Sequence, residues 1–297
     1  YINEFTQSST GGVITFGFPL ADFTRLFTNY SYEQVSVSEL NTDLLTPAVL
    51  AGNPYLQDSL LLGQGGTRVI SKVVPSLSYN TVDNPIFPSS GRRFTAGIDL
   101  AGLGGDTNFY KPVLEGVYYW KQSNRLSLGM RGQFAYIHQF SGSKSLPITE
   151  KLFLGGEYSV RGFDIRTIGP KDPVTGLVLG GNKSLLFNIE QNITIAGPVR
   201  LILFYDAGQV QAGPQVVAPS AFVLDGESLG YTVQPGSNFH LADFKTSTGA
   251  EIRFMMPVLN VPFRLIFAYN PQRSGVFDNT LLPQKAFQFR FAVGSTF

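Results

Sequence analysis

The sequence contains no cysteine, little charge and no long apolar run. Without cysteine the chain forms no disulfide and no thiolate metal site. Charged residues make up 14% of the 297 residues, whereas soluble chains carry about 25%. Part of the surface is therefore expected to contact something other than water. No apolar run reaches the roughly 18 residues of a membrane-spanning helix, so a membrane protein with this sequence must cross with strands of about 9 to 11 residues.

The charged and catalytic residue types exclude several classes of function. The 22 basic and 21 acidic residues are nearly equal, which gives no indication of nucleic-acid binding. The two histidines, His138 and His240, lie in or beside expected loops, and no Ser-His-acid order or metal-ligand cluster is present. We therefore expect no enzyme activity, no metal and no cofactor. No basic and then apolar segment opens the chain at Tyr1, so any export signal is expected to be removed or to lie upstream.

The dominant sequence period is two. In residues 125–136, one face carries Leu126, Leu128 and Met130, and the other carries Arg125, Ser127 and Arg131, which predicts a strand with one apolar and one polar side. Eleven such strands are predicted, each near spanning length. They cover residues 13–18, 25–33, 69–80, 93–100, 113–120, 125–136, 184–195, 199–210, 248–256, 263–269 and 287–297.

Two observations favour a membrane barrel over a soluble all-β sandwich. The polar faces are mostly Ser, Thr, Gly, Asn and Gln, whereas the outer face of a sandwich is rich in Lys and Glu. The connections also alternate in length, as they do in bacterial barrels: residues 196–198 and 257–262 are tight, while 39–66, 141–182 and 211–243 are long. The predicted fold class is an all-β, transmembrane antiparallel β-barrel.

Four motifs spread over most of the chain carry a family resemblance. They are a turn at 79–91, with Asp83, Asn84, Pro85, Pro88 and Gly91; a loop at 154–170, with Val160, Arg161, Gly162 and Phe163; the strand 204–210; and a final strand that ends on Phe297. Together they resemble the BamA superfamily, which includes the TamA and two-partner-secretion branches. The Ser-Val-Arg-Gly-Phe run followed by Thr-Ile-Gly-Pro favours the BamA branch.

The resemblance implies a barrel of sixteen strands preceded by periplasmic POTRA domains. Residues 1–297 are then the C-terminal portion of the barrel, with an inward-folded loop at about 141–183. The N-terminal strands, about five, and all POTRA domains are expected to be missing from this sequence. An eleven-stranded sheet would also leave open edges that hydrocarbon does not tolerate, which again indicates a partial barrel.

Arg161 is the central residue of the predicted site. Period-two counting puts Glu190 and Asp206 on the inner faces of consecutive strands, and the resemblance implies that both are acidic partners of the loop arginine. A guanidinium suits this position because its planar fork engages carboxylates bidentately. Gly162 permits a tight bend beside the arginine, and Phe163 supplies an apolar anchor.

The last strand is the second predicted site. Phe287, Phe289, Phe291, Val293 and Phe297 are expected to form one apolar ridge. The resemblance implies a weakly paired seam between the first and last strands, where an incoming strand pairs by β-augmentation. Gly294 matches a position at which the family's final strand bends.

The function implied by the resemblance is the insertion of nascent β-barrel proteins into the bacterial outer membrane, without ATP or a cofactor. The expected partners are nascent outer-membrane β-barrel proteins, outer-membrane lipid, accessory lipoproteins, and the missing strands and POTRA domains of the same protein. Two alternatives stay open, a translocation pore of the TamA or two-partner-secretion type and a passive porin. The loop at 141–182 is mostly Gly, Pro and apolar residues, whereas a porin constriction normally carries rings of charge.

Overall fold

The computed structural model describes most of the chain. The described residues are 6–38, 66–140, 146, 149–171, 178, 180–212, 215–217, 232–234, 237–256, 261–280, 282–294 and 296–297. Residues 39–65 of the predicted loop at 39–66 and residues 257–260 of the predicted tight turn at 257–262 lie outside them.

Fourteen strands and one short 3-10 helix form within this part of the chain. They are β1 Thr6–Ala21, β2 Thr24–Ser38, β3 Gly66–Asn80, β4 Gly91–Ala101, β5 Phe109–Lys121, β6 Leu126–Tyr136, β7 His138–Gln139, β8 Lys183–Ala196, β9 Val199–Gln211, β10 Gln215–Val217, β11 Thr232–Gln234, η2 Leu241–Asp243, β12 Lys245–Met256, β13 Val261–Tyr269 and β14 Phe287–Val293.

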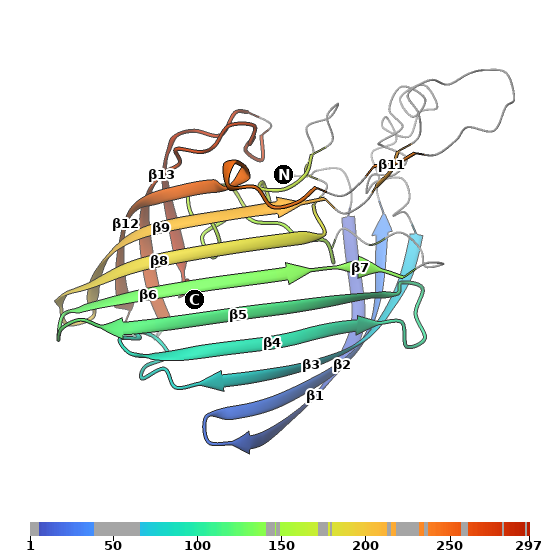
Figure 1. Cartoon of the computed structure of the whole chain (residues 1–297), viewed down its shortest axis with the longest axis horizontal. Helices are drawn as coiled ribbons and strands as arrows, with labels where there is room; N and C mark the ends of the chain where they lie inside the picture. Colours follow the sequence, from blue (N-terminus) through green and yellow to red (C-terminus); the bar gives the residue numbers. More distant parts are fainter. Residues whose placement is uncertain are drawn as a thin grey trace, which may run out of the picture.

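One antiparallel sheet contains nearly all of these strands. Its order is β1-β2-β3-β4-β5-β6-β8-β9-β12-β13-β14, with β7 paired to β5, and β10 and β11 form a separate hairpin. The eleven strands predicted from the sequence all lie on this path, so the all-β antiparallel prediction is confirmed. The sheet rolls into a deep trough whose edge strands are β1 and β14, and the segment after β7 runs through its interior (Figure 1).

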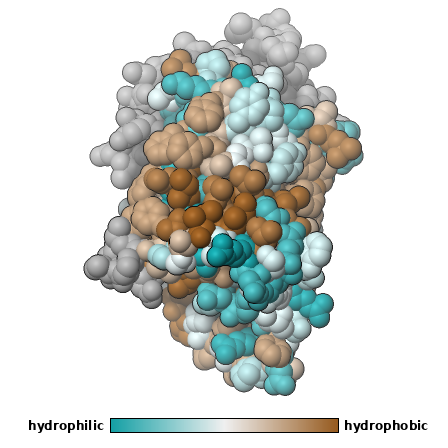
Figure 2. Space-filling model, turned by 90° about the vertical axis from the view of Figure 1, so that its left-hand side faces the viewer, coloured by the Kyte–Doolittle hydropathy of each residue, from teal (hydrophilic) through white to brown (hydrophobic). Residues whose placement is uncertain are grey.

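The sheet is apolar outside and polar inside. On β8, Phe187 and Ile189 are exposed on the outer face, while Asn188 and Glu190 between them are buried. The same alternation on β9 exposes Leu203 and buries Asp206. A soluble domain shows the opposite arrangement, because exposed apolar patches of this extent do not persist in water. Figure 2 shows apolar side chains gathered in a band across one end of the molecule, with hydrophilic side chains below it.

Described residues of the segment between β7 and β8 pack in the interior. Leu154, Val160, Phe163 and Ile168 of this segment form a cluster with Leu186 of β8, Val210 of β9 and Val276. Leu152 contacts this cluster and also a second one around Phe109 and Ile137. No helix in the described ranges is long and apolar enough to cross a membrane.

Several predicted strand boundaries were wrong, including the end of β2, which runs to Ser38 and not to the predicted Glu33. β1 is longer than the predicted 13–18, because it pairs with β2 in register over almost its whole length. The final strand is shorter than the predicted 287–297. β14 ends at Val293, since Gly294 adopts a φ of 103° that a continuing strand does not allow. The predicted loop at 211–243 contains the β10-β11 hairpin and η2.

Candidate functional site

The segment at 149–171 is held inside the trough by its own backbone pairs. Leu154 and Ile168 exchange two backbone hydrogen bonds of 3.0 Å each, and Leu152 pairs with Gly181 beside the start of β8. Val160 and Phe163 are both fully buried in the cluster that also holds Leu186. This packing presents Arg161, between them, to the polar inner faces of β8 and β9.

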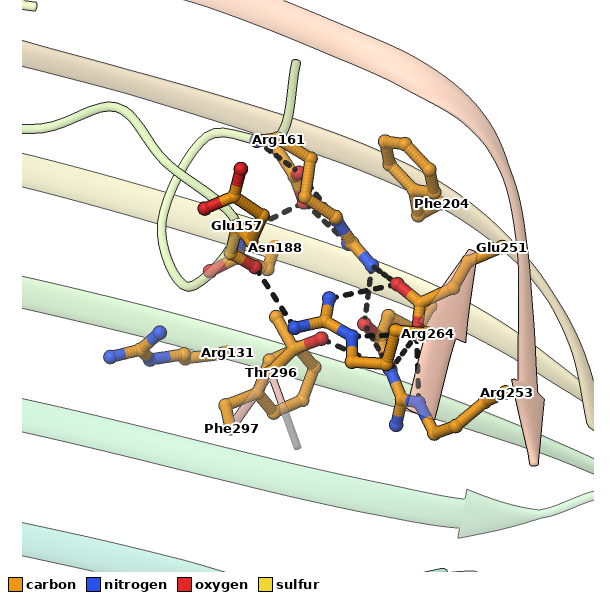
Figure 3. A network of polar contacts seen from close by, with 12 residues as sticks. Arg131, Glu157, Arg161, Asn188, Phe204, Glu251, Arg253, Arg264, Thr296 and Phe297 are labelled. Carbon is orange, nitrogen blue, oxygen red and sulfur yellow. Dashed lines mark hydrogen bonds and ion pairs between the residues drawn. The ribbon is translucent and has the colours of Figure 1, made fainter. Parts of the chain in front are cut away.

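Arg161 is fully buried and makes contact with three carboxylates (Figure 3). Its Nε and Nη2 donate to the two oxygens of Asp206 at 2.7 Å each, a bidentate pair, and its backbone N–H donates to the same carboxylate at 3.0 Å. Its Nη1 donates to Glu190 at 2.7 Å and to Glu251 at 3.2 Å. The guanidinium carbon also lies 3.8 Å from the centre of the Phe204 ring, a cation–π contact.

Glu251 of β12 connects Arg161 to two arginines of the sheet. Arg264 of β13 donates to both oxygens of Glu251 at 2.8 Å, and Arg253 approaches Glu251 to 2.7 Å and Glu190 to 3.4 Å. Arg264 also donates to the backbone carbonyl of Glu157 in the inserted segment, at 3.2 Å. The sheet and the segment therefore share one continuous ion network.

The formal charges of this network cancel only when the segment is in place. Three arginines, Arg161, Arg253 and Arg264, face three carboxylates, Glu190, Asp206 and Glu251. The sheet alone supplies three negative and two positive charges to this network, so the part of the inner wall that faces Arg161 has a formal charge of −1. An uncompensated buried charge is strongly unfavourable. The excess negative charge of the sheet therefore favours the bound position of the segment, in which Arg161 neutralises it.

Gly162 is required by the space beside Arg161. Its φ is 80°, and a Cβ built there would lie 2.6 Å from the Cβ of Ala268 on β13 and 2.7 Å from Oδ1 of Asn270. Its carbonyl accepts a hydrogen bond of 2.9 Å from Gln284. Only glycine fits this conformation and this close approach to β13.

A second ion cluster holds the beginning of the segment. Glu150 accepts from Lys72 of β3 at 2.8 Å and from Lys111 of β5 at 2.5 Å, and Lys111 also contacts Asp99 of β4 at 3.2 Å. Burial works to raise the pKa of Glu150, but Lys111 and Lys72 outweigh it and the pKa lies below its ordinary value. Glu150 thus attaches the segment to β3 and β5, and Arg161 attaches it to β8 and β9.

The turn at 81–90 is shaped by two side chains of its motif. The Asp83 carboxylate accepts from the backbone and hydroxyl of Ser89 and from the backbone of Ser90, and Asn84 accepts from two backbone N–H groups at 2.8 and 2.9 Å. Gly91 follows with a φ of 104°, and a Cβ built there would lie only 2.3 Å from the backbone carbonyl oxygen of Thr81. Pro85 and Pro88 lie within this turn.

The same turn faces a polar cavity of about 240 Å³ at the end of the trough. Pro88, together with Tyr119 and Arg253, is part of the cavity lining. Phe87 lies under the guanidinium of Arg200 on β9, 4.8 Å from ring centre to guanidinium carbon. The turn therefore reaches across the end of the sheet to strands distant in sequence.

Asp83 gives the turn a predictable pH response. Burial works to raise its pKa, but hydrogen bonds from Ser89 and Ser90 outweigh burial and lower the pKa to about 2. Because the folded pKa lies below the unfolded value of about 3.9, the stabilisation is complete above that value and is lost as the pH falls through 2. We expect carboxyl NMR of the folded protein to show Asp83 titrating near pH 2. A midpoint near 4, equal to that of the urea-unfolded chain, would contradict this structure of the turn.

The end of the chain turns into the trough. Phe287, Phe289 and Phe291 form the expected outward ridge, but Phe297 does not belong to it. After Gly294 the backbone bends inward, and Phe297 stacks on Tyr119 of β5 with ring centres 6.0 Å apart. The Tyr119 hydroxyl donates to the Phe297 carbonyl at 3.1 Å. The prediction for Phe297 was wrong because the positive φ of Gly294 breaks the period of two.

The inserted segment also contacts this last strand. The hydroxyl of Tyr158 donates to the carbonyl of Val293, and Arg290 of β14 pairs with Asp164. The other oxygen of Asp164 accepts from the backbone N–H of Asn279 at 3.0 Å. A displacement of the segment would therefore remove contacts that hold β14.

The structure brings Arg161, Glu190 and Asp206 together, and it adds residues that the sequence reasoning missed. Glu251, Arg253 and Arg264 complete the network, and Glu150 anchors the segment elsewhere. Period two on residues 248–256 already puts Glu251 and Arg253 on one face, so part of this signal was present. No group of three or more metal-ligating side chains occurs in the portions of the chain that are described.

The chain matches a known protein family over nearly its whole length. The sequence profile of the Omp85 superfamily domain matches residues 2–297. The chain belongs to the Omp85 superfamily. The match covers the strands, the arginine segment and the last strand alike, so the sheet and the ion network are parts of one Omp85 domain.

Curated relatives of this Omp85 chain are named as outer membrane protein assembly factors. BamA of Nitratidesulfovibrio vulgaris is 23% identical over 304 residues, which cover 100% of this chain and 33% of that protein. BamA of Neorickettsia risticii is 30% identical over 236 residues, which cover 77% of this chain and 29% of that protein. The chain thus spans about a third of the length of these relatives. The relationship places it in the bacterial outer membrane.

A solved structure shows the same fold. BamA from Haemophilus ducreyi, lacking POTRA domains 1-3, superposes with a TM-score of 0.72 over 98% of this chain and 55% of that chain, at 19% identity. The rolled antiparallel sheet is therefore a part of an Omp85 transmembrane barrel.

Proposed function

We propose that this Omp85 chain is the C-terminal part of a factor that inserts β-barrel proteins into the outer membrane, and that it is not an enzyme. The observation that carries the proposal is the continuous contact from the Arg161 network through Tyr158 and Asp164 to β14. Relatives named as outer membrane protein assembly factors support it. The proposed partners are nascent β-barrel proteins, outer-membrane lipid, accessory lipoproteins, and further strands and POTRA domains of the same protein.

The insertion site that we propose is the free side of β14. β14 pairs with β13 on one side only within the described residues, so its other backbone edge is able to pair with an incoming strand. The outward Phe287, Phe289 and Phe291 continue an apolar surface up to that edge. The energy of insertion comes from the client, because burying its apolar face in lipid and closing its hydrogen bonds are both favourable.

The inserted segment sets the position of this edge. Tyr158 fixes the carbonyl of Val293 next to the bend at Gly294, and Asp164 fixes Arg290, three residues earlier on β14. Since Arg161 lies between these two residues in the segment, the ion network determines where both are held. The proposed role of Arg161 is therefore structural and regulatory.

The test of the function uses the full-length protein in liposomes. Unfolded client barrels are added, and their folding is followed by heat-modified gel mobility. We expect client folding to accelerate with the protein and to slow when an introduced disulfide closes β14 against the first strand of the complete barrel. Residues 1–297 contain no cysteine that could compete with the introduced pair. Equal folding rates with empty liposomes would refute the proposal, and ion conductance without client folding would identify a passive pore.

Glu150 offers an independent test of how the segment is held. Glu150→Lys places three cations together, and we expect a lower unfolding temperature and slower client folding because like charges repel at this partly buried site. Combining it with Lys111→Glu again gives two cations and two carboxylates, counting Asp99, and is expected to recover most of the loss.

The control for this charge exchange is Glu157→Lys, in the same segment. The Glu157 side chain makes no hydrogen bond or ion pair in the described ranges, although its backbone carbonyl does. Its substitution should leave both measurements near those of the wild type. A double variant no more stable than Glu150→Lys alone would show that the Lys72 and Lys111 contacts do not hold the segment.

A further inference from the structure

The outer face of the sheet has a notch floored by two glycines. Gly116 of β5 and Gly132 of β6 are directly paired, and the same row continues to Phe94 of β4 on one side and Phe187 of β8 on the other. A Cβ at Gly116 would meet nothing within 4 Å, and one at Gly132 would meet only the ring of Phe187, at 3.6 Å. Phe94 and Phe187 are 47% and 44% exposed and form the two walls.

The notch continues along the strands toward the short turns. The next outward row is Arg92, Tyr118, Met130 and Ile189, paired in that order across β4, β5, β6 and β8. Together these rows line an apolar groove of about 550 Å³, within the range of ligand-binding cavities, roughly 300 to 1,000 Å³. The groove exists because two paired residues on adjacent strands, Gly116 and Gly132, have no side chains to fill its floor.

The groove leaves little clearance for a helix of a partner protein. Its phenylalanine walls stand on strands three spacings apart, about 14 Å between backbones before the rings are counted. A helix with its side chains is roughly 10 to 12 Å across. An extended hydrocarbon chain is thinner and matches the apolar lining.

One end of the groove carries an uncompensated positive charge. The guanidinium of Arg92 lies over the ring of Tyr79, 5.5 Å from its centre, and pairs with no carboxylate in the described ranges. The adjacent Arg93 points inward and pairs with Glu115 at 3.2 Å, so the two arginines differ in environment. An outward arginine of this kind matches a phosphate, which its fork engages bidentately.

The position of Arg92 corresponds to the headgroup level of a membrane. Arg92 is the second residue of β4, directly after the turn at 81–90, and Trp120, the only tryptophan of the chain, is exposed at the same end of β5. Tryptophan and tyrosine gather at the membrane–water interface. The short turns of bacterial barrels face the periplasm, so this end lies at the periplasmic leaflet.

We propose that this groove is a binding site for one phospholipid of the periplasmic leaflet, with an acyl chain over Gly116 and Gly132 and the phosphate on Arg92. The site lies on the outer face of the sheet, away from the Arg161 network and from β14. It therefore goes beyond the proposed function, and a failure of client insertion would not affect it.

The test is native mass spectrometry of the full-length protein in detergent, titrated with palmitoyl-oleoyl-phosphatidylglycerol. Gly116→Leu with Gly132→Leu fills the floor, and Arg92→Gln removes the charge and is not expected to disturb folding, which heat-modified gel mobility verifies. We expect each to weaken retention of the first lipid about tenfold, the effect of losing one charge-assisted contact or a fitted apolar site.

Two matched variants serve as controls. Ala250→Leu enlarges a small outward residue of β12, which pairs with the exposed Leu203 and Phe267, and Arg125→Gln removes an exposed arginine of a short turn. Both should retain lipid as the wild type does. Unchanged retention in the Arg92 and glycine variants, or equal loss in the controls, would mean nonspecific annular lipid and overturn the proposal. A photo-crosslinker at Met130 that captures a polypeptide in membranes instead of lipid would overturn it too.

Discussion

Replacing Arg161 by alanine is expected to unseat the inserted segment. The variant leaves three buried carboxylates, Glu190, Asp206 and Glu251, facing two arginines. Removing one partner of a buried ion pair costs about 3 to 5 kcal/mol, less where water enters the barrel. We expect a reduction of this size in the free energy of unfolding, measured by urea titration with heat-modified gel mobility, and failure to complement a depletion strain.

Two further variants separate the charge of Arg161 from its size. Arg161→Ala with Asp206→Asn returns the wall to a formal charge of zero, and we expect this pair to recover part of the loss. Arg166→Ala removes an exposed arginine of the same segment whose guanidinium lies 4.1 Å from the centre of the Phe153 ring, and it should cost less than Arg161→Ala because Arg166 is at the surface. Full stability and growth of the Arg161→Ala variant would rule out the role of the network.

Replacing Glu251 by glutamine is expected to have an effect as large. Glu251 accepts hydrogen bonds from Arg161, Arg253 and Arg264, and it is fully buried. The glutamine has nearly the same shape but no charge, so the variant leaves three cations with two carboxylates. We expect a loss of about 3 to 5 kcal/mol in the free energy of unfolding by the same titration.

Hydrogen exchange of the last strand distinguishes this effect from general destabilisation. Because the network holds Tyr158 and Asp164 against β14, hydrogen exchange of the β14 amides should rise more than that of β5. The matched control is Glu157→Gln, whose side chain lies in the same interior without an ion pair in the described part. A uniform rise in exchange across all strands would argue against coupling between the network and β14.

The strand pattern was readable from the sequence because a β-strand has an unambiguous period. Residues 184–195 alternate apolar and polar side chains, and β8 exposes the first set and buries the second. The same counting put Glu190 and Asp206 on the interior side, where they contact Arg161. Low charge and the absence of a long apolar run indicated a sheet that crosses a membrane. The apolar face of each strand is then the face expected to contact lipid.

The partners contributed by distant strands were not readable in this way. Glu251 lies 90 residues from Arg161 and Glu150 lies 78 residues from Lys72, and alternation fixes a face but not a height along the strand. Height depends on the register of every strand pair between them. For the same reason, nothing in the sequence indicated that Phe297 would lie on Tyr119.

The sequence by itself determined a membrane sheet with its charge inside, since alternation and composition are local properties of each strand. Tertiary structure alone decided which charges meet. The rolling of the sheet brings β8, β9, β12 and β13 around the guanidinium of Arg161. Without this group, the carboxylates that face it exceed the arginines by one negative charge. Electrostatic energy depends on distance across the barrel, and that distance exists only once the strands are in register.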